Sequence, residues 1–199
     1  MSKPFSQACE NNKQPILDII SRYFHPGDEV LEIGSGTGQH TLYFCEKMPW
    51  LCWIPSEIPE NLASIQAGLE GQAPPNLEAI KTIDVRDEPW PVPHINGVFS
   101  ANCLHIMSAE FVPDFFRGAG AVIGPGGHLC VYGPFKYQGE FTSDSNKRFD
   151  QWLKERDAVS GIRDFEWVDE LAGKQGFSLL ADHAMPANNQ LLVWQRNPR

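Results

Sequence analysis

The stretch Glu29-Val-Leu-Glu-Ile-Gly-Ser-Gly-Thr-Gly38 decides the fold that this sequence predicts. Its first five residues are typical of a short strand, and the strand runs directly into three glycines at alternate positions. The residues from Thr37 to Met48 then indicate a helix. A strand, a glycine-rich turn and a helix in this order form the place where an open parallel sheet binds its ligand. We therefore expect a ligand site at the end of the first strand.

The spacing of these glycines argues against a dinucleotide. The fingerprint G-x-G-x-x-G needs a small residue at position 39, but Gln39 stands there and the third glycine, Gly38, comes one residue early. Glycines let a backbone approach its ligand closely, while Glu32 places a negative charge beside the bound molecule. A carboxylate repels a pyrophosphate and attracts an ammonium or sulfonium group. The pattern therefore favours a positively charged ligand.

Two more acidic residues follow the next two predicted strands. Glu57 comes just after the strand 52–56, where a carboxylate can accept hydrogen bonds from both hydroxyls of a ribose. Asp84 follows the predicted strand 77–83 and is placed to hold the exocyclic amine of an adenine. Together with the glycine loop, these residues predict a site for a nucleoside that carries positive charge.

Strands and helices alternate along the rest of the chain. Further helices are predicted over 15–24, with Pro15 in the first turn, and over 61–69, 109–123, 143–156 and 165–174; further strands are predicted over 98–104, 128–132, 177–184 and 190–195. The last two strands are so close that they must pair antiparallel. We expect a Rossmann-like α/β fold, with a mostly parallel seven-stranded sheet that ends in an antiparallel hairpin and has helices on both faces.

Size and composition limit the classes of function. The chain of 199 residues suits a single domain over 1–199, with 1–25 as its N-terminal helical segment. A polar N-terminus and the lack of a long apolar run predict a cytoplasmic protein that does not bind membranes. A net charge of −9 argues against nucleic-acid partners. Five scattered cysteines without a C-x-x-C pair indicate neither disulfides nor a metal site. The sequence leaves the oligomeric state open.

Through the glycine loop, Glu57, Asp84 and the strand order across 29–195, the chain resembles the class I S-adenosylmethionine-dependent methyltransferases. It is similar in particular to one uncharacterised branch, the methyltransferase-like protein twenty-six family. The resemblance implies S-adenosylmethionine as the cofactor and leaves the methyl acceptor open. The stretches that carry the closer similarity are Asn11–Leu17, Asn102–Ile106, Tyr132–Phe135, Phe141–Asp150, Gly161–Asp164 and Met185–Asn189. The implied cofactor-binding residues are Glu32, Gly34, Gly36, Gly38, Glu57, Asp84, Val85 and Asn102.

A methyl acceptor is expected at the carboxyl ends of the later strands, where open parallel sheets bind ligands. Methyl transfer is a direct displacement, so the protein mainly aligns the reactants and excludes water; a hydroxyl acceptor also calls for a general base. His105 is the best-placed base, and residues 136–165 are expected to form a lid. The catalytic candidates are His105, Tyr132 and Tyr137, and the substrate-binding candidates are Phe135, Arg148, Arg163, Asn188 and Asn189.

Several candidates also have a purely structural interpretation. His105 can be a packed core histidine, and the tyrosines can serve packing alone. Arg163 can pair with Asp164 to order the lid and Arg148 can be a solvated helix residue, or either arginine can bind an acceptor carboxylate. Asn188 and Asn189 suit a turn without any ligand.

The function expected from the sequence is methyl transfer from S-adenosylmethionine to an oxygen, nitrogen or sulfur nucleophile of a small molecule. One alternative is a non-catalytic module that binds the same cofactor for regulation. The other is a nicotinamide-dependent oxidoreductase, which Gln39 and Glu32 argue against. Protein and nucleic-acid acceptors are disfavoured because the chain has no basic surface.

Overall fold

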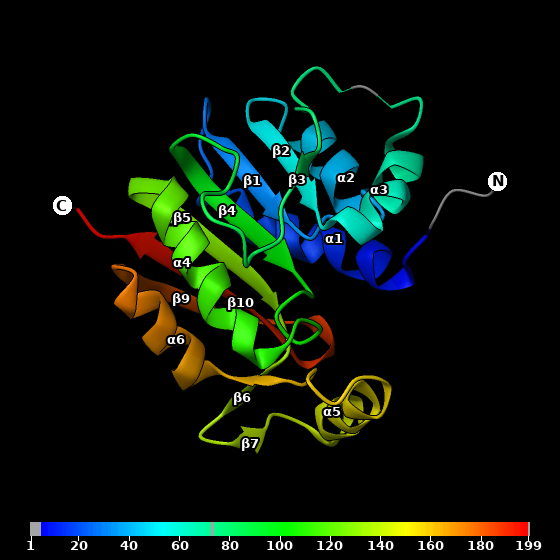
Figure 1. Ribbon diagram of the computed structural model, residues 1–199, viewed down its shortest axis with the longest axis vertical. Helices are drawn as coiled ribbons and strands as arrows, with labels where there is room; N and C mark the ends of the chain where they lie inside the picture. Colours follow the sequence, from blue (N-terminus) through cyan, green and yellow to red (C-terminus); the bar gives the residue numbers. More distant parts are fainter. Residues whose placement is uncertain (1–4, 73, 199) are drawn as a thin grey trace.

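A seven-stranded sheet forms the centre of the computed structural model, which describes residues 5–72 and 74–198 (Figure 1). The strand order is β3-β2-β1-β4-β5-β10-β9. The first five of these strands run parallel, whereas β10 is antiparallel to both β5 and β9. The predicted α/β fold with a terminal antiparallel hairpin is therefore confirmed. The strands are β1 Glu29–Ile33, β2 Cys52–Glu57, β3 Lys81–Thr82, β4 Ile95–Ala101, β5 Ile123–Gly133, β9 Phe177–Met185 and β10 Asn189–Arg196.

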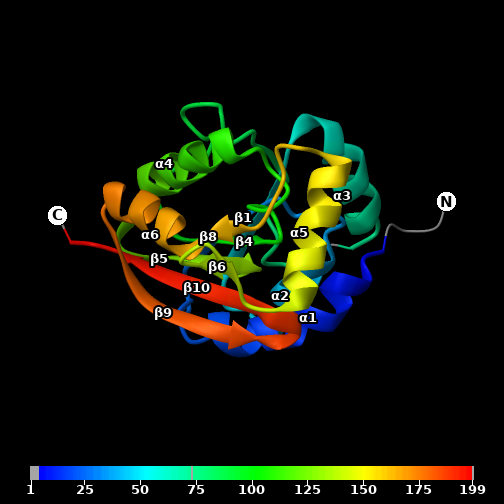
Figure 2. The same cartoon turned by 90° about the horizontal axis from the view of Figure 1, so that it is seen from below.

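Helices cover both faces of this sheet (Figure 2). Helices α1 and α2 pack on one face around Phe44, and α4 and α6 pack on the other around Phe115 and Phe116. Strand β1 contributes Val30 to the first cluster and Leu31 to the second, as expected of a parallel strand buried on both sides. The helices are α1 Gln7–Ile20, α2 Gln39–Lys47, α3 Leu62–Leu69, α4 Val112–Val122, α5 Asp144–Arg156 and α6 Phe165–Lys174, with short 3₁₀ turns at Pro59–Asn61, Ala109–Phe111 and Pro186–Asn188.

Residues 135–164 form a separate layer at the carboxyl ends of the strands. Three short strands, β6 Phe135–Tyr137, β7 Glu140–Phe141 and β8 Arg163–Asp164, make a small sheet in the order β7-β6-β8, and α5 lies beside it. Figure 1 shows this layer below the arrowhead of β4. The side-chain amide of Asn146 in α5 donates to the carbonyl of Asn188, which joins α5 to the β9–β10 turn.

Several predicted boundaries differ from the structure; β5, for example, begins at Ile123 and not at residue 128. Helix α1 begins at Gln7, capped by the hydroxyl of Ser6, so Pro15 lies inside the helix and not in its first turn. The residues before Pro15 are mostly polar, so they show no helical periodicity of apolar residues. Strand β3 is reduced to Lys81–Thr82, with Leu77 forming one isolated bridge. Strand β4 ends at Ala101, because Asn102 has a φ of 59° that no regular strand accepts. No helix in the described part of the chain is long and apolar enough to cross a membrane.

Candidate functional site

The three glycines after β1 all have left-handed backbone conformations, but only one of them faces open space. The φ angles of Gly34, Gly36 and Gly38 are 75°, 58° and 74°. A Cβ on Gly34 would lie 2.4 Å from the sulfur of Cys103, and a Cβ on Gly38 would lie 2.8 Å from Leu69. A Cβ on Gly36 would meet nothing within 4 Å. The loop is therefore packed from behind at two glycines and open at the middle one.

Two residues that support this loop were missed by sequence reasoning. The thiol of Cys103 donates to the carbonyls of Ile33 and Ala101, at 3.4 and 3.3 Å, and burial raises its pKa to about 12. A Cβ on Gly68 in α3 would lie 1.9 Å from the carbonyl oxygen of Thr37, so this glycine lets α3 approach the loop. A glycine inside a predicted helix was the available signal; nothing in the sequence pattern pointed to Cys103.

Glu57, at the end of β2, lies against the open side of the loop. Its carboxylate accepts hydrogen bonds from the backbone N–H groups of Gly36 at 2.8 Å and Ile58 at 2.9 Å. The side-chain amide of Asn61 donates a third bond at 3.3 Å. The Glu57 side chain is buried, with only 5% of its surface exposed. The structure thus brings the predicted acid and the predicted glycine together at the carboxyl edge of the sheet.

Glu32 has a different environment from the one expected. Its carboxylate accepts hydrogen bonds from the hydroxyl of Thr41 in α2 and from the indole of Trp53, at 3.0 Å for the indole. Burial raises the pKa of Glu32, and the bonds from Thr41 and Trp53 act in the opposite direction. Thr41 lies in α2 and Trp53 in the α1/α2 cluster, so the Glu32 carboxylate is bonded to the core on that side of the sheet.

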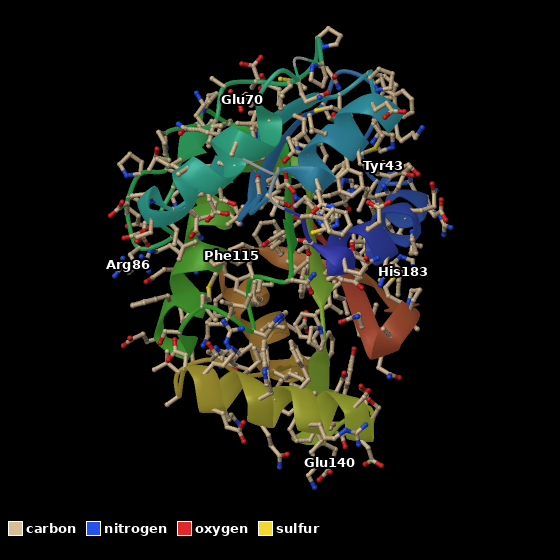
Figure 3. The ribbon with its side chains drawn as sticks, turned by 90° about the vertical axis from the view of Figure 1, so that its right-hand side faces the viewer. Tyr43, Glu70, Arg86, Phe115, Glu140 and His183 are labelled. Atoms are coloured by element: carbon tan, nitrogen blue, oxygen red, sulfur yellow. The ribbon has the colours of Figure 1, made fainter. Side chains whose placement is uncertain are left out.

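The carboxylate of Asp84, which follows β3, forms an ion pair with Arg86. The Nε of Arg86 lies 2.9 Å from both carboxylate oxygens of Asp84, and the backbone N–H of Arg86 donates a further bond. These contacts lower the pKa of Asp84. The guanidinium of Arg86 also lies 4.9 Å from the ring centre of Phe111. The side chain of Val85 packs in the apolar core, so only the backbone of this predicted residue is available to a ligand. Figure 3 shows Arg86 at the edge of the molecule, well away from Tyr43.

The turn after β4 carries Asn102 and His105. The backbone N–H of Asn102 donates to the carbonyl of Tyr132 at 2.8 Å, which joins the ends of β4 and β5. The ring of His105 is buried and meets the ring of Phe149 in α5 edge-on, with 5.4 Å between centroids. Burial, with a smaller effect from Arg163, lowers the pKa of His105 to about 4. The imidazole is therefore neutral at neutral pH, and no hydrogen bond joins it to another of the described residues.

The two tyrosines expected at the site have different surroundings. Burial raises the pKa of the Tyr132 hydroxyl, at the end of β5, and the side chains of Asn12 and Asn189 act in the opposite direction. The hydroxyl of Tyr137 donates to Asp182 on the edge strand β9, at 2.6 Å, and its ring stacks on Phe165 of α6. Tyr137 is therefore engaged on the α6 side of the sheet, which does not support the predicted catalytic role.

Phe135 and the two arginines also differ from the predicted substrate contacts. Phe135 is a core residue with 1% exposure, because the pleat of β6 turns it toward the α4/α6 cluster. Arg148 is exposed on α5. Arg163 is buried and donates to three backbone carbonyls. It does not pair with Asp164, whose carboxylate lies 3.1 Å from the Nζ of Lys136, so the proposed Arg163–Asp164 ion pair is wrong.

Asn188 and Asn189 belong to the β9–β10 turn. The side chain of Asn188 donates to Ser145 of α5 at 3.2 Å, and its φ of 57° is left-handed. The side chain of Asn189 donates to the carbonyl of Pro186 at 3.2 Å. Both side chains thus satisfy the turn and its contact with α5, the structural interpretation that the sequence allowed.

Two buried neutral histidines give the protein a defined acid sensitivity. Burial lowers the pKa of both His40 and His105 to about 4, against roughly 6.5 for an unfolded chain. The unfolded state binds more protons between these values, so stability falls as the pH drops from 6.5 toward 4. Each histidine is expected to contribute a slope of about 1.4 kcal/mol per pH unit.

Urea unfolding at several pH values between 7 and 5 measures this slope. His40→Gln keeps an N–H donor for the 2.6 Å contact with Asn12. This variant is expected to reduce the slope of stability against pH by the contribution of one histidine, about 1.4 kcal/mol per pH unit. His25→Gln, at an exposed histidine, is the matched control for the substitution. Equal slopes in the His40 variant and the wild type would refute the assignment.

The fold is that of the class I methyltransferases. An O-methyltransferase family protein from Burkholderia thailandensis matches with a TM-score of 0.80 and 17% identity, over 96% of this chain and 57% of that one. Human N-acetylserotonin methyltransferase in complex with SAM matches with a TM-score of 0.78 and 15% identity, over 96% and 53%. CalO1, a methyltransferase in calicheamicin biosynthesis in its SAH-bound form, matches with a TM-score of 0.71 and 17% identity, over 96% and 55%. The chain thus spans little more than half the length of these proteins.

Residues 3–196 match the model of the family described as "Protein of unknown function (DUF938)". The match covers nearly the whole sequence, so the chain belongs to this family. The description of the family assigns no activity.

Proposed function

We propose that this protein binds S-adenosylmethionine and transfers its methyl group to a small-molecule acceptor. The observation that carries the proposal is the contact between the open glycine, Gly36, and the buried carboxylate of Glu57. A backbone that can be approached closely, beside an acid that can accept two hydrogen bonds, suits the ribose of a nucleoside.

The residues around the loop fit this cofactor. The oxygens of Glu57 are acceptors for the ribose hydroxyls, and Asp84 remains an acceptor for an exocyclic amine while Arg86 keeps it ionised. Two proteins of the same fold are described with this cofactor or its product: the human N-acetylserotonin enzyme with SAM and CalO1 with SAH. When bound, the cofactor supplies a methyl group on a sulfonium that already carries its leaving group.

On the acceptor side, His105 is the residue that can hold a proton. Its imidazole is neutral at neutral pH and makes no hydrogen bond to the described part of the chain, so its nitrogens remain available to an acceptor hydroxyl. We propose a hydroxyl acceptor, which agrees with the Burkholderia protein's description as an O-methyltransferase family member. Because Arg148 is exposed and Arg163 is engaged with carbonyls, neither supports recognition of an acceptor carboxylate.

We extend the proposal to the domain, the lid and the cellular location of the protein. We place residues 1–199 in one domain, with 136–165 as the lid that excludes water above His105, and Tyr132 as a residue lining the site. We also place the chain in the methyltransferase-like protein twenty-six branch and in the cytoplasm, without nucleic-acid or membrane partners. A non-catalytic cofactor-binding module remains the alternative function, and it differs in transferring no methyl group.

Two measurements test the proposal. Denatured protein is first examined by mass spectrometry, and carried-over S-adenosylmethionine or S-adenosylhomocysteine is expected. Folded protein is then incubated with methyl-labelled cofactor and a small-molecule extract, and label is expected in an extract component. Cofactor without transfer to any component would favour the regulatory module, and NAD in place of either nucleoside would overturn the proposal.

A further inference from the structure

Arg163 joins two loops that are far apart in the sequence. This residue lies on β8, and its side chain is buried, with 9% exposure. Its Nε donates to the carbonyl of Leu104 at 3.0 Å, and its Nη2 donates to those of Met107 at 2.5 Å and Val159 at 3.1 Å. Leu104 and Met107 lie on either side of His105 in the turn after β4. One guanidinium thus holds the two flanks of the turn that carries the imidazole.

The same turn is held by a second set of contacts from the loop after α5. The backbone N–H of Gly161 donates to the carbonyl of His105 itself at 2.9 Å. The hydroxyl of Ser160 donates to the carbonyl of Ile106 at 2.7 Å. The buried carboxylate of Asp150 accepts the N–H of Ile162 at 2.8 Å and fixes this loop to α5. Each carbonyl from Leu104 to Met107 therefore accepts a hydrogen bond from the segment Ser160–Arg163.

The geometry of these bonds requires an arginine. A guanidinium is planar, presents its donors in a fixed fork and stays charged when buried, whereas a lysine ammonium is a single point on a flexible stem. A lysine at 163 keeps the charge but cannot reach carbonyls on both flanks of the turn in the same arrangement. Lysine and methionine at this position therefore separate the effect of geometry from the effect of charge.

We propose that Arg163 is a positioning residue that holds the imidazole of His105 at the acceptor site by fixing the turn Leu104–Met107. The inference rests on the proposed function, in which His105 accepts the acceptor's proton. It also gives a role to a buried arginine whose donors serve the protein backbone.

The electrostatic environment of His105 supplies a second readout beside the amide exchange of Gly161. Arg163 faces the imidazole from β8 and lowers its pKa, in addition to the larger effect of burial. From α5 the charged groups nearby are Asp150 and Lys154, which pair with each other at 2.6 Å. Phe149, whose ring meets the imidazole edge-on, carries no charge. Removing the charge of Arg163 therefore raises the pKa of His105 toward its ordinary value.

The experiment uses the full chain without acceptor. The imidazole of His105 is titrated by NMR from pH 8 to 5, and amide exchange of Gly161 is measured, in wild type, Arg163→Met and Arg163→Lys. Arg148→Met, at an exposed arginine of α5, is the matched control. Wild type and control are expected to show no His105 titration in this range. Arg163→Met is expected to show the start of a His105 titration at the acid end of this range, because burial, the larger effect, still lowers the pKa. Arg163→Lys is expected to show none, and both variants are expected to exchange Gly161 at least tenfold faster.

Two results would overturn the inference. One is a folded Arg163→Met protein whose His105 titration and Gly161 protection match the wild type. The other is an Arg163→Lys protein with wild-type Gly161 protection, which also decides the question if the methionine variant does not fold. Cofactor binding by the wild type is measured separately, so a protein that binds no S-adenosylhomocysteine defeats the proposed function without affecting this assay.

Discussion

Replacing Glu57 with alanine is expected to weaken binding of S-adenosylhomocysteine about 100-fold. A buried carboxylate that accepts two hydrogen bonds from a ribose contributes roughly 3 kcal/mol to binding, because each hydrogen bond to a charged group is worth about 1.5 kcal/mol or more. The carboxylate also orders the loop through the N–H of Gly36, so the free loop becomes less well prepared for its ligand. Calorimetric titration of both proteins measures the change.

Glu60→Ala is the matched control for this prediction. Glu60 lies in the 3₁₀ turn directly after β2, three positions from Glu57, and its side chain is exposed. The control removes the same charge at nearly the same place and is expected to change the affinity less than threefold. Equal losses in the two variants would mean that Glu57 acts only through the net charge of the region.

Gly68→Ala is expected to lower the free energy of unfolding by about 3 kcal/mol, with a fall in Tm of roughly 6 to 12 °C. The added Cβ would lie 1.9 Å from the carbonyl oxygen of Thr37, a backbone atom that cannot turn aside as a side chain can. Relief requires α3 to move away from the glycine loop. Cofactor affinity is therefore expected to fall together with stability.

Gly173→Ala provides the control for this substitution. Gly173 is also the second-last residue of its helix, α6, but a Cβ there meets nothing within 4 Å. Alanine at this position is expected to be neutral or to stabilise the protein by up to about 1 kcal/mol, since glycine is the poorer helix former. Thermal unfolding measures the stability of the two variants. A similar loss of stability in both would contradict the close approach at Gly68.

Local patterns in the sequence were sufficient to predict the sheet and its terminal hairpin. Alternation of apolar strands with helices gave the order, and the short Met185–Asn189 connection gave the antiparallel pair. The start of α1 could not be predicted, because its first turns are polar and are held by long-range contacts such as Gln39 with the backbone of Ser6. Local propensity carries no information about a partner 33 residues away.

Prediction of the site residues has the same limit, because local sequence patterns carry no information about distant partners. Gly36 and Glu57 could be predicted as site residues because they lie at the ends of the first two strands. The ends of these strands follow from the local sequence pattern alone. The roles of Phe135 and Arg163 depend on which way a short strand faces and on which carbonyls lie nearby, and these are decided by packing of 135–164 as a whole. Cys103 was missed because its partner, Gly34, is brought to it only by the pairing of β1 with β4.

Calorimetric titration of the wild-type protein with S-adenosylhomocysteine, and in parallel with NAD, tests the central claim most directly. The account predicts saturable binding of the adenosyl compound at one site per chain and no heat with NAD. Saturable heat with NAD, together with none from S-adenosylhomocysteine or S-adenosylmethionine, would contradict it.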